Sequence, residues 1–148
     1  MLIKQKPTTS GRRHQITIDR SELYKGKPEK SLLASGHKKR SGRGFKGHIT
    51  MRHRGAGVKK KMRIIDWKRK NRGVEGNVIR LEYDPMRSAH LALIYYKDGS
   101  KGYILAPQGL AADDVVVAGE NVEVKVGNSL ALKNIPIGMF IHNIEMRA

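Results

Sequence analysis

Short apolar runs separated by turn residues organise the second half of the chain. One run covers residues 74–83, and the Asp-Pro pair at 84–85 breaks it, because the proline ring fixes φ and disfavours helical geometry in the residue before it. A second run covers 91–96. The Asp-Gly pair at 98–99 then turns the chain into a third run at 102–106, since Gly tolerates the positive φ of a hairpin turn. The pattern predicts a β-hairpin at the centre of the fold.

Three further stretches have the composition of short strands. They are residues 48–52, where apolar and polar positions alternate, 62–68, and 110–117. No stretch has a convincing amphipathic helical period. Several short strands at regular spacing, bounded by Gly, Asp and Pro, predict an all-β protein with a small closed barrel. Five strands in a Greek-key arrangement would suit the oligonucleotide-binding (OB) class.

The last part of the chain has a strand pattern of its own. Val122, Val124 and Val126 alternate with charged residues, and apolar runs follow at 130–135 and 139–144. This predicts the opening of a second sheet. Two or three strands are too few for independent stability.

The charge divides the chain differently from the apolar pattern. Residues 1–72 carry 23 Lys and Arg against four Asp and Glu, whereas residues 73–148 carry seven against nine. We therefore expect a basic extension at 1–42, an OB-like barrel at 43–119 and an incomplete second barrel at 120–148. Residues 1–47 have too few apolar side chains to offset their ordering entropy, so we expect them to be unstructured when unbound, with 15–19 pairing as a strand once bound. One-sided positive charge favours a nucleic-acid-binding arm over a solvated tail or a localisation signal.

Several functional classes are disfavoured. The chain has no Cys, which excludes disulfides and thiolate metal sites, and it has no apolar run of membrane-spanning length. The first residues lack the apolar core of a secretory signal, so secretion is not expected. Gly42, Gly44 and Gly47 match G-x-G-x-x-G, but no apolar strand precedes them and no helical pattern follows, so we interpret them as positions where the backbone approaches phosphates closely.

We expect neither an enzyme nor a metal or cofactor site. His37, His48 and His53 fit no common zinc spacing and are interpreted as RNA-facing imidazoles. The turn acids are expected to be solvated rather than paired in a catalytic pocket; they are Asp84, Asp98, Asp113 and Asp114. No phosphate-binding G-x-x-x-x-G-K-[ST] loop is present.

The aromatic residues bear on the kind of nucleic acid. Only Tyr24, Phe45 and Trp67 lie in the basic half, and the four later tyrosines lie in apolar strands where core packing is expected. This favours recognition of folded RNA by shape, phosphates and 2′-hydroxyls over base stacking along a single strand. The expected contacts are the basic residues of the first half and one arginine in the turn after 74–83, which a barrel would hold out toward a partner. They are Arg12, Arg13, His14, Lys38, Lys39, Arg40, Arg43, Lys46, Arg52, His53, Arg54, Lys59, Lys60, Arg63, Arg69 and Arg87.

Six stretches resemble one known family. They are T-S-G-R-R-H, G-H-I-T-M-R-H-R-G-A-G, E-Y-D-P-M-R-S-A, I-Y-Y-K-D-G, Y-I-L-A-P-Q-G-L and G-N-S-L-A-L-K-N-I-P-I-G. In one register over almost all of the chain they are similar to the N-terminal part of the L-two family of large-subunit ribosomal proteins, of bacterial or organellar type. The resemblance implies an OB-like barrel followed by the start of an SH3-like barrel. Arg52, Arg54 and Arg87 lie in the best-matched stretches.

The resemblance also implies a function and a location. It implies binding to large-subunit ribosomal RNA beside neighbouring ribosomal proteins, near the subunit interface, with a role in organising the peptidyl-transferase region. The compartment would be the bacterial cytoplasm or an organelle matrix, and no membrane is involved. The alternative is a free-standing basic OB-type factor that binds single-stranded nucleic acid.

The resemblance covers only the N-terminal part of the family. The apolar residues of 120–148 would form an open sheet edge, which aggregates unless it is covered. Three explanations stay open: a separate chain carries the C-terminal half of the family, the sequence is part of a longer chain, or RNA and neighbouring proteins cover the edge. The third is disfavoured because RNA is a poor partner for a valine-rich face.

Overall fold

The computed structural model describes residues 2–34, 41–55, 57–58 and 60–146. His37, Lys38, Lys39, Arg40 and Lys59, for which RNA contacts are expected, lie outside this range. The elements are β1 (Leu2–Lys4), β2 (Ile16–Ile18), the 3₁₀ turn η1 (Lys30–Leu32), β3 (Gly76–Glu82), β4 (Leu91–Tyr96), β5 (Lys101–Leu105), β6 (Val115–Val116) and the 3₁₀ turn η2 (Leu132–Asn134). The described residues contain no α-helix.

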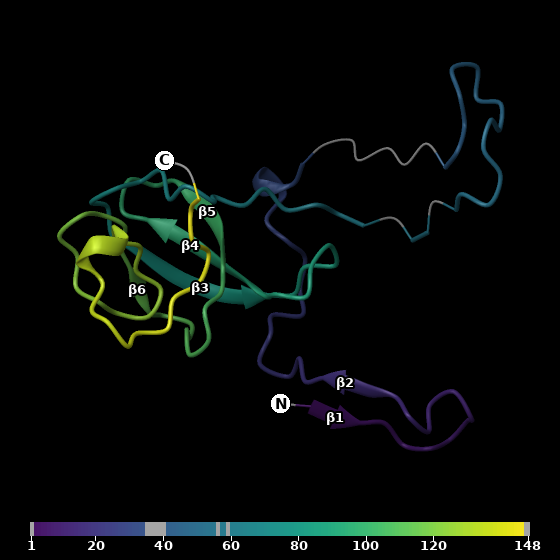
Figure 1. Ribbon diagram of the computed structural model, residues 1–148, viewed down its shortest axis with the longest axis horizontal. Coiled ribbons are helices and arrows are strands. Elements are labelled where there is room, and N and C mark those ends of the chain that lie inside the picture. The colour runs from purple at the N-terminus through teal and green to yellow at the C-terminus, as the bar shows by residue number, and fades with distance from the viewer. Residues whose placement is uncertain (1, 35–40, 56, 59, 147–148) are drawn as a thin grey trace.

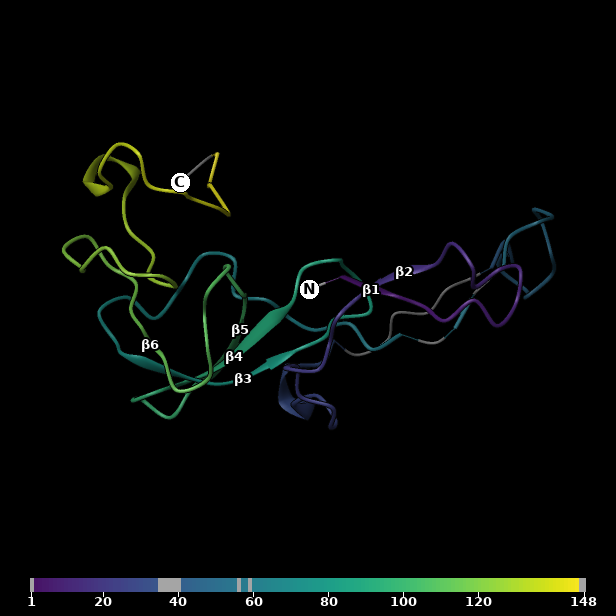
Figure 2. The same cartoon turned by 90° about the horizontal axis from the view of Figure 1, so that it is seen from below.

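The body of the molecule is one curled antiparallel sheet. Its strand order is β5-β4-β3-β6, and every neighbouring pair is antiparallel. Figure 1 shows the sheet curling so that β6 and the chain beyond it close over one face, and Figure 2 shows the same half-barrel from below. This confirms the predicted all-β, OB-like fold class.

Strand β4 lies at the centre of the core. Val78, Ala92 and Ile94 pack with Leu110 and Val116 on the inner face of the sheet. On the other face, a second buried cluster is formed by Ile65, Leu91, Leu93 and Tyr103. Because β4 is buried on both faces, its sequence is a continuous apolar run, and its predicted bounds of 91–96 are confirmed.

The turn between β4 and β5 is also as predicted. Gly99 has a φ of 82°, in the left-handed region that glycine tolerates. The backbone N–H of Tyr96 donates to the carbonyl of Ser100 at 2.9 Å, which closes the hairpin. The turn therefore sets the register in which Leu93 faces Tyr103.

A β-bulge in β3 decides which residues face which side. Val78 lies opposite Ile94, but Arg80 lies opposite Leu93, so the register shifts by one residue at Ile79. Residues directly opposite each other share a face, and a one-residue shift moves the following side chains to the other face. The shift turns Arg80, and Glu82 with it, away from the inner core.

The basic N-terminal segment contains a hairpin. A strand, β2, forms within residues 15–19, where pairing was expected only in the bound state; here it already pairs with β1, for which the sequence gave no expectation. After this hairpin the chain runs along the barrel: the N–H of Tyr24 donates to the carbonyl of Leu81, and the N–H of Ala34 donates to the carbonyl of Met62. Residues 23–34 therefore contact the barrel, so the expected boundary at residue 42 has contacts across it. Both the hairpin and residues 41–55 project from the barrel on the same side (Figure 1).

Of the predicted strands, two are reduced to isolated bridges and a third is shorter than expected. Residues 48–52 form only an isolated bridge, in which Ile49 pairs with Arg43, because this segment projects from the body and has no longer strand beside it. Residues 62–68 contribute isolated bridges at Arg63 and Ile65. The strand expected at 110–117 is reduced to β6.

The predicted second sheet is absent from the described residues 120–146. In that segment Ser129 forms an isolated bridge with Ala118, and residues 132–134 form the turn η2, but no strand is present. The alternation at 122–126 was misleading, because a strand needs a neighbour to accept its hydrogen bonds and cover its apolar side. Val124 and Val126 are exposed.

Candidate RNA interface

The first group of cations lies at the end of the β1–β2 hairpin. The N–H groups of Arg12 and Arg13 both donate to the carbonyl of Thr9 at 3.1 Å, and the N–H of Gln15 donates to the carbonyl of Arg12. These bonds make a compact turn. Arg12, Arg13 and His14 are exposed on it, so the turn presents three cationic or titratable groups away from the barrel.

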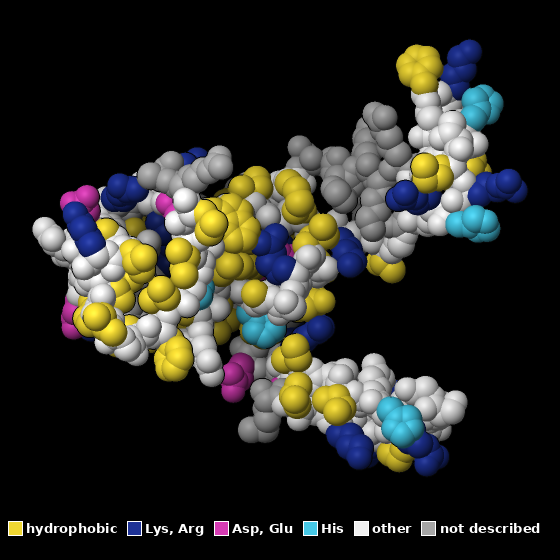
Figure 3. Space-filling view, viewed as in Figure 1, with side chains coloured by type: hydrophobic (Ala, Val, Ile, Leu, Met, Phe, Trp, Pro, Cys, Tyr) yellow, Lys and Arg dark blue, Asp and Glu magenta, His cyan; other side chains and the backbone are white. Residues whose placement is uncertain are grey.

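The second group lies on a segment that we call the basic loop, residues 41–55. Its exposed basic side chains are Arg43, Lys46, His48, Arg52, His53 and Arg54. Figure 3 shows Lys and Arg, His and hydrophobic side chains together at the outer end of this loop. The sequence has no Asp or Glu from residue 30 to residue 65, so no carboxylate on this stretch neutralises the loop. Such a surface suits a polyanion.

Glycine shapes the base of the basic loop. The carbonyl of Gly42 accepts the N–H groups of Thr50 (2.9 Å) and Met51 (3.1 Å) and the hydroxyl of Thr50 (3.1 Å). Gly42 has a φ of 72°, and a Cβ there would overlap the carbonyl of Met51. Gly42 therefore closes the loop on itself, while the close approach of the glycine backbone to phosphates stays a prediction.

Three of the expected RNA contacts have partners inside the protein. The guanidinium of Arg69 donates to the carbonyl of Gly127 at 2.7 Å, and burial lowers its pKa. Arg87 Nε donates to Asp84 Oδ2 at 2.7 Å. Arg63 donates to the carbonyl of Lys61 at 3.0 Å and lies 3.9 Å from Glu82. Lys60, by contrast, is exposed.

Asp84 corrects the expectation of a solvated turn acid. It is fully buried, and its other oxygen accepts the N–H of Met86 at 2.9 Å. The guanidinium of Arg87 also lies over the ring of Trp67, at 5.6 Å from its centroid. Asp84 therefore holds both the turn and Arg87 in place. The sequence had predicted that Arg87 would reach outward toward a partner.

A second buried acid, Glu82, lies where residues 23–34 contact the barrel, and its burial was not expected from the sequence. It is 2% exposed. Its carboxylate accepts Arg80 Nε at 2.8 Å and the hydroxyl of Tyr103 at 2.9 Å. That hydroxyl in turn accepts the N–H of Glu29 at 3.0 Å. Burial raises the pKa of Tyr103 to about 12, so the phenol stays protonated and can donate to Glu82.

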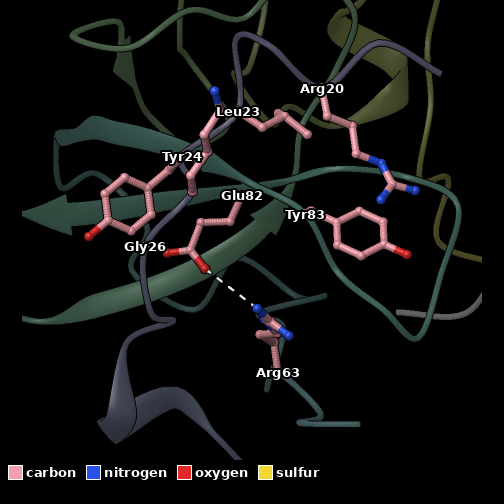
Figure 4. A pocket seen from close by; sticks show the side chains of 8 residues that line it. Arg20, Leu23, Tyr24, Gly26, Arg63, Glu82 and Tyr83 are labelled. Carbon is pink, nitrogen blue, oxygen red and sulfur yellow. Dashed lines mark ion pairs between the residues drawn. The ribbon is translucent and has the colours of Figure 1, made fainter. Parts of the chain in front are cut away.

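A cavity of about 330 Å³ opens beside Glu82. Figure 4 shows Arg63 directed at the Glu82 carboxylate, with Tyr24 and Tyr83 on opposite sides of it. Each tyrosine ring has a guanidinium over it: Arg20 lies 3.8 Å from the centroid of Tyr83, and Arg80 lies 4.0 Å from that of Tyr24. The cavity thus lies where the N-terminal residues 20–26 pack against β3, through alternating cations, aromatic rings and one carboxylate.

The other predictions of the sequence have mixed outcomes. Tyr96 and Tyr103 are buried as predicted, while Tyr83 and Tyr95 are half-buried. Within the described ranges, no group of three or more His, Asp or Glu side chains is placed to hold a metal ion. No helix in the part of the chain that the structure describes is long and apolar enough to cross a membrane.

A small antiparallel barrel with two projecting, acid-poor basic segments defines a β-barrel protein of the RNA-binding type. Residues 29–118 match the family described as "Ribosomal Proteins L2, RNA binding N-terminal domain". The chain is also 55% identical over 146 residues to the large ribosomal subunit protein uL2 of Buchnera aphidicola subsp. Schizaphis graminum; the match covers 99% of this chain and 53% of that protein. The chain belongs to the L2 family of ribosomal proteins, and it spans about half the length of this curated relative. The matched region begins at residue 29, so it includes the contacts of Glu29 with the barrel as well as the basic loop.

Proposed function

We propose that this chain is a non-catalytic, structural constituent of the large ribosomal subunit. It binds large-subunit ribosomal RNA beside neighbouring ribosomal proteins, and it supports the assembly and organisation of the peptidyl-transferase region. The relative from Buchnera is a bacterial protein, which favours the bacterial cytoplasm over an organelle matrix.

The observation that carries the proposal is the basic loop. Its exposed cations lie within a stretch of the chain without acids, and this stretch falls inside the match to an RNA-binding domain. Binding there releases counterions from the phosphates and is driven by positive charge on one side of the protein. The hairpin end with Arg12, Arg13 and His14 is a second exposed basic group, and it projects from the same side of the barrel (Figure 1).

The residues divide into two roles. Arg12, Arg13, His14, Arg43, Lys46, Arg52, His53, Arg54 and Lys60 are proposed as direct RNA contacts. Arg63, Arg69 and Arg87 have internal partners, so we propose that any contact they make with RNA is secondary to holding the barrel together. Lys38, Lys39, Arg40 and Lys59 stay predictions from the sequence.

Sedimentation of a cell lysate through a gradient with high magnesium tests the proposal. The chain should travel with large subunits and resist moderate salt. A free single-strand-binding factor would stay near the top of the gradient, and that result would reject the ribosomal assignment. Identifying the proteins of the purified particle by mass also tests the prediction of a separate chain with the C-terminal half of the family. A single longer chain in the particle would contradict that prediction.

A further inference from the structure

One apolar side chain at the tip of the basic loop is fully exposed. Phe45 has a relative exposure of 101%, as high as an unfolded chain would give. Isolated exposed apolar residues are common on protein surfaces and need no explanation by themselves. The position of Phe45 needs an explanation, because phenylalanine is not among the residues that turns favour.

The backbone holds Phe45 at the tip of the basic loop. The N–H of Gly44 donates to the carbonyl of His48 at 2.8 Å, and the N–H of Gly47 donates to the carbonyl of Gly44 at 3.2 Å. Phe45 and Lys46 are thus the two central residues of a closed four-residue turn. A side chain at this place projects from the loop, and its ring is presented without a further change in the backbone.

The charge around the ring indicates its partner. Arg43, Lys46 and His48 are all exposed within three residues of Phe45. A protein surface that covered the ring would have to supply acids to neutralise these groups. A nucleic acid supplies phosphates for the cations and an aromatic base for the ring at the same time.

We propose that Phe45 is a stacking site for one unpaired base of the ribosomal RNA that the basic loop binds. This inference rests on the proposed function and deepens it by naming a contact with a base within a surface that otherwise recognises phosphates and shape. The cations fix the loop on the RNA backbone, and the ring adds an energy term that depends on an unstacked base being within reach.

The chain provides a matched control. Phe140 is the other phenylalanine of the sequence, and it is equally exposed, at 105%. It lies in the half of the chain that has no excess of basic residues. Replacing each residue with Ala removes the same side chain from a basic and from a non-basic setting.

The test measures the affinity of the full chain for large-subunit ribosomal RNA purified from native particles, at several salt concentrations. Phe45→Ala should weaken binding by roughly 5- to 150-fold, the range found when a stacking aromatic is removed, and should leave the salt dependence unchanged because no charge is lost. Lys46→Ala should reduce the salt dependence instead. Phe45→Trp should bind like the original chain, Phe45→Leu should not, and Phe140→Ala should have no effect. Thermal unfolding confirms that each variant is folded.

A fluorescence signal gives a second readout. Trp67 is the only tryptophan, so the double variant Trp67→Phe, Phe45→Trp carries one reporter on the turn. Its emission should be quenched when RNA binds, because the indole stacks on a base.

The outcomes separate the two proposals. Failure of the original chain to bind the RNA would reject the proposed function and this inference with it. If the original chain binds and Phe45→Ala binds within twofold of it, the stacking site alone is wrong. Full affinity of Phe45→Leu would also overturn it, because an aliphatic side chain has no ring to stack.

Discussion

Replacing Glu82 with Gln tests whether the buried carboxylate stabilises the fold where the N-terminal segment packs against the barrel. The change keeps the size of the side chain and removes its charge. Arg63 and Arg80 would then face an uncharged amide, and their side chains are only 9% and 23% exposed. An amide group also brings a donor to a site where Arg80 and Tyr103 already donate.

The expected loss of unfolding free energy is about 3 kcal/mol. Breaking a buried ion pair by removing one partner costs about 3–5 kcal/mol, and the partial exposure of Arg80 places this site at the lower end. For a chain of this length, each kcal/mol lowers the melting temperature by roughly 2–4 °C, so a decrease of about 6–12 °C is expected. Urea denaturation followed by circular dichroism measures the free energy, and a thermal scan measures the temperature.

Glu75→Gln is the matched control. Glu75 also forms an ion pair, with Lys97 Nζ at 2.5 Å, but both side chains are largely exposed. Exposed pairs contribute about 0–1 kcal/mol, so this variant should be nearly as stable as the original chain. If Glu82→Gln destabilises the protein no more than Glu75→Gln does, the buried carboxylate does not stabilise the fold in the way proposed.

Three further predictions concern the same region. Gly26→Ala should destabilise the chain by about 0.5–1 kcal/mol, because a Cβ would push the exposed ring of Tyr24 away from the guanidinium of Arg80; in a Tyr24→Ala background the change should be harmless, and an equal cost in both backgrounds would contradict this reasoning. Tyr103 stabilises the fold fully below pH 10, and this contribution should be lost as the pH rises through about 12, since its raised pKa favours the neutral phenol; Tyr103→Phe should lack this part of the pH dependence of stability, and identical profiles would refute it. Asp84→Asn should cost about 3 kcal/mol by leaving Arg87 without its charged partner, and a urea midpoint equal to that of the original chain would contradict this.

The core of the fold could be predicted because its signals are local. The run at 91–96 is apolar on both faces, and the Asp-Gly pair after it specifies a tight turn, so the β4–β5 hairpin follows from the sequence. The alternation at 122–126 is equally clear but forms no strand, because pairing and burial depend on a neighbouring strand that the pattern does not reveal.

The two buried acids show where local reasoning ends. Glu82 sits in an apolar strand, and only the spacing of Val78 and Leu81, three residues apart on one face, hinted at the bulge that turns it outward from the inner core. Asp84 precedes a proline and has the local sequence of a surface turn. Its burial depends on how the turn packs against the rest of the chain, and no short window of sequence contains that information.

The exposure of the cations could be predicted where the chain leaves the barrel. Cations on the hairpin end and the basic loop are exposed, because the neighbouring sequence has few apolar groups to bury them and no acids to pair with them. Arg63, Arg69 and Arg87 are nearer the barrel, where carboxylates and carbonyls distant in sequence reach them. The sequence does not distinguish the two groups of cations, because it gives the positions of the charges and not the partners that the fold brings to them.

The measurement that tests the central claim most directly is the salt dependence of binding to large-subunit ribosomal RNA. If the chain neutralises about ten phosphates, the affinity should fall by orders of magnitude between roughly 50 and 200 mM salt. Replacing Arg52 and Arg54 with Ala should flatten the slope by up to about two units, while Lys97→Ala, which removes a cation already paired with Glu75, should change it little. A shallow slope for the original chain, or equal slopes for the arginine and lysine variants, would contradict the account.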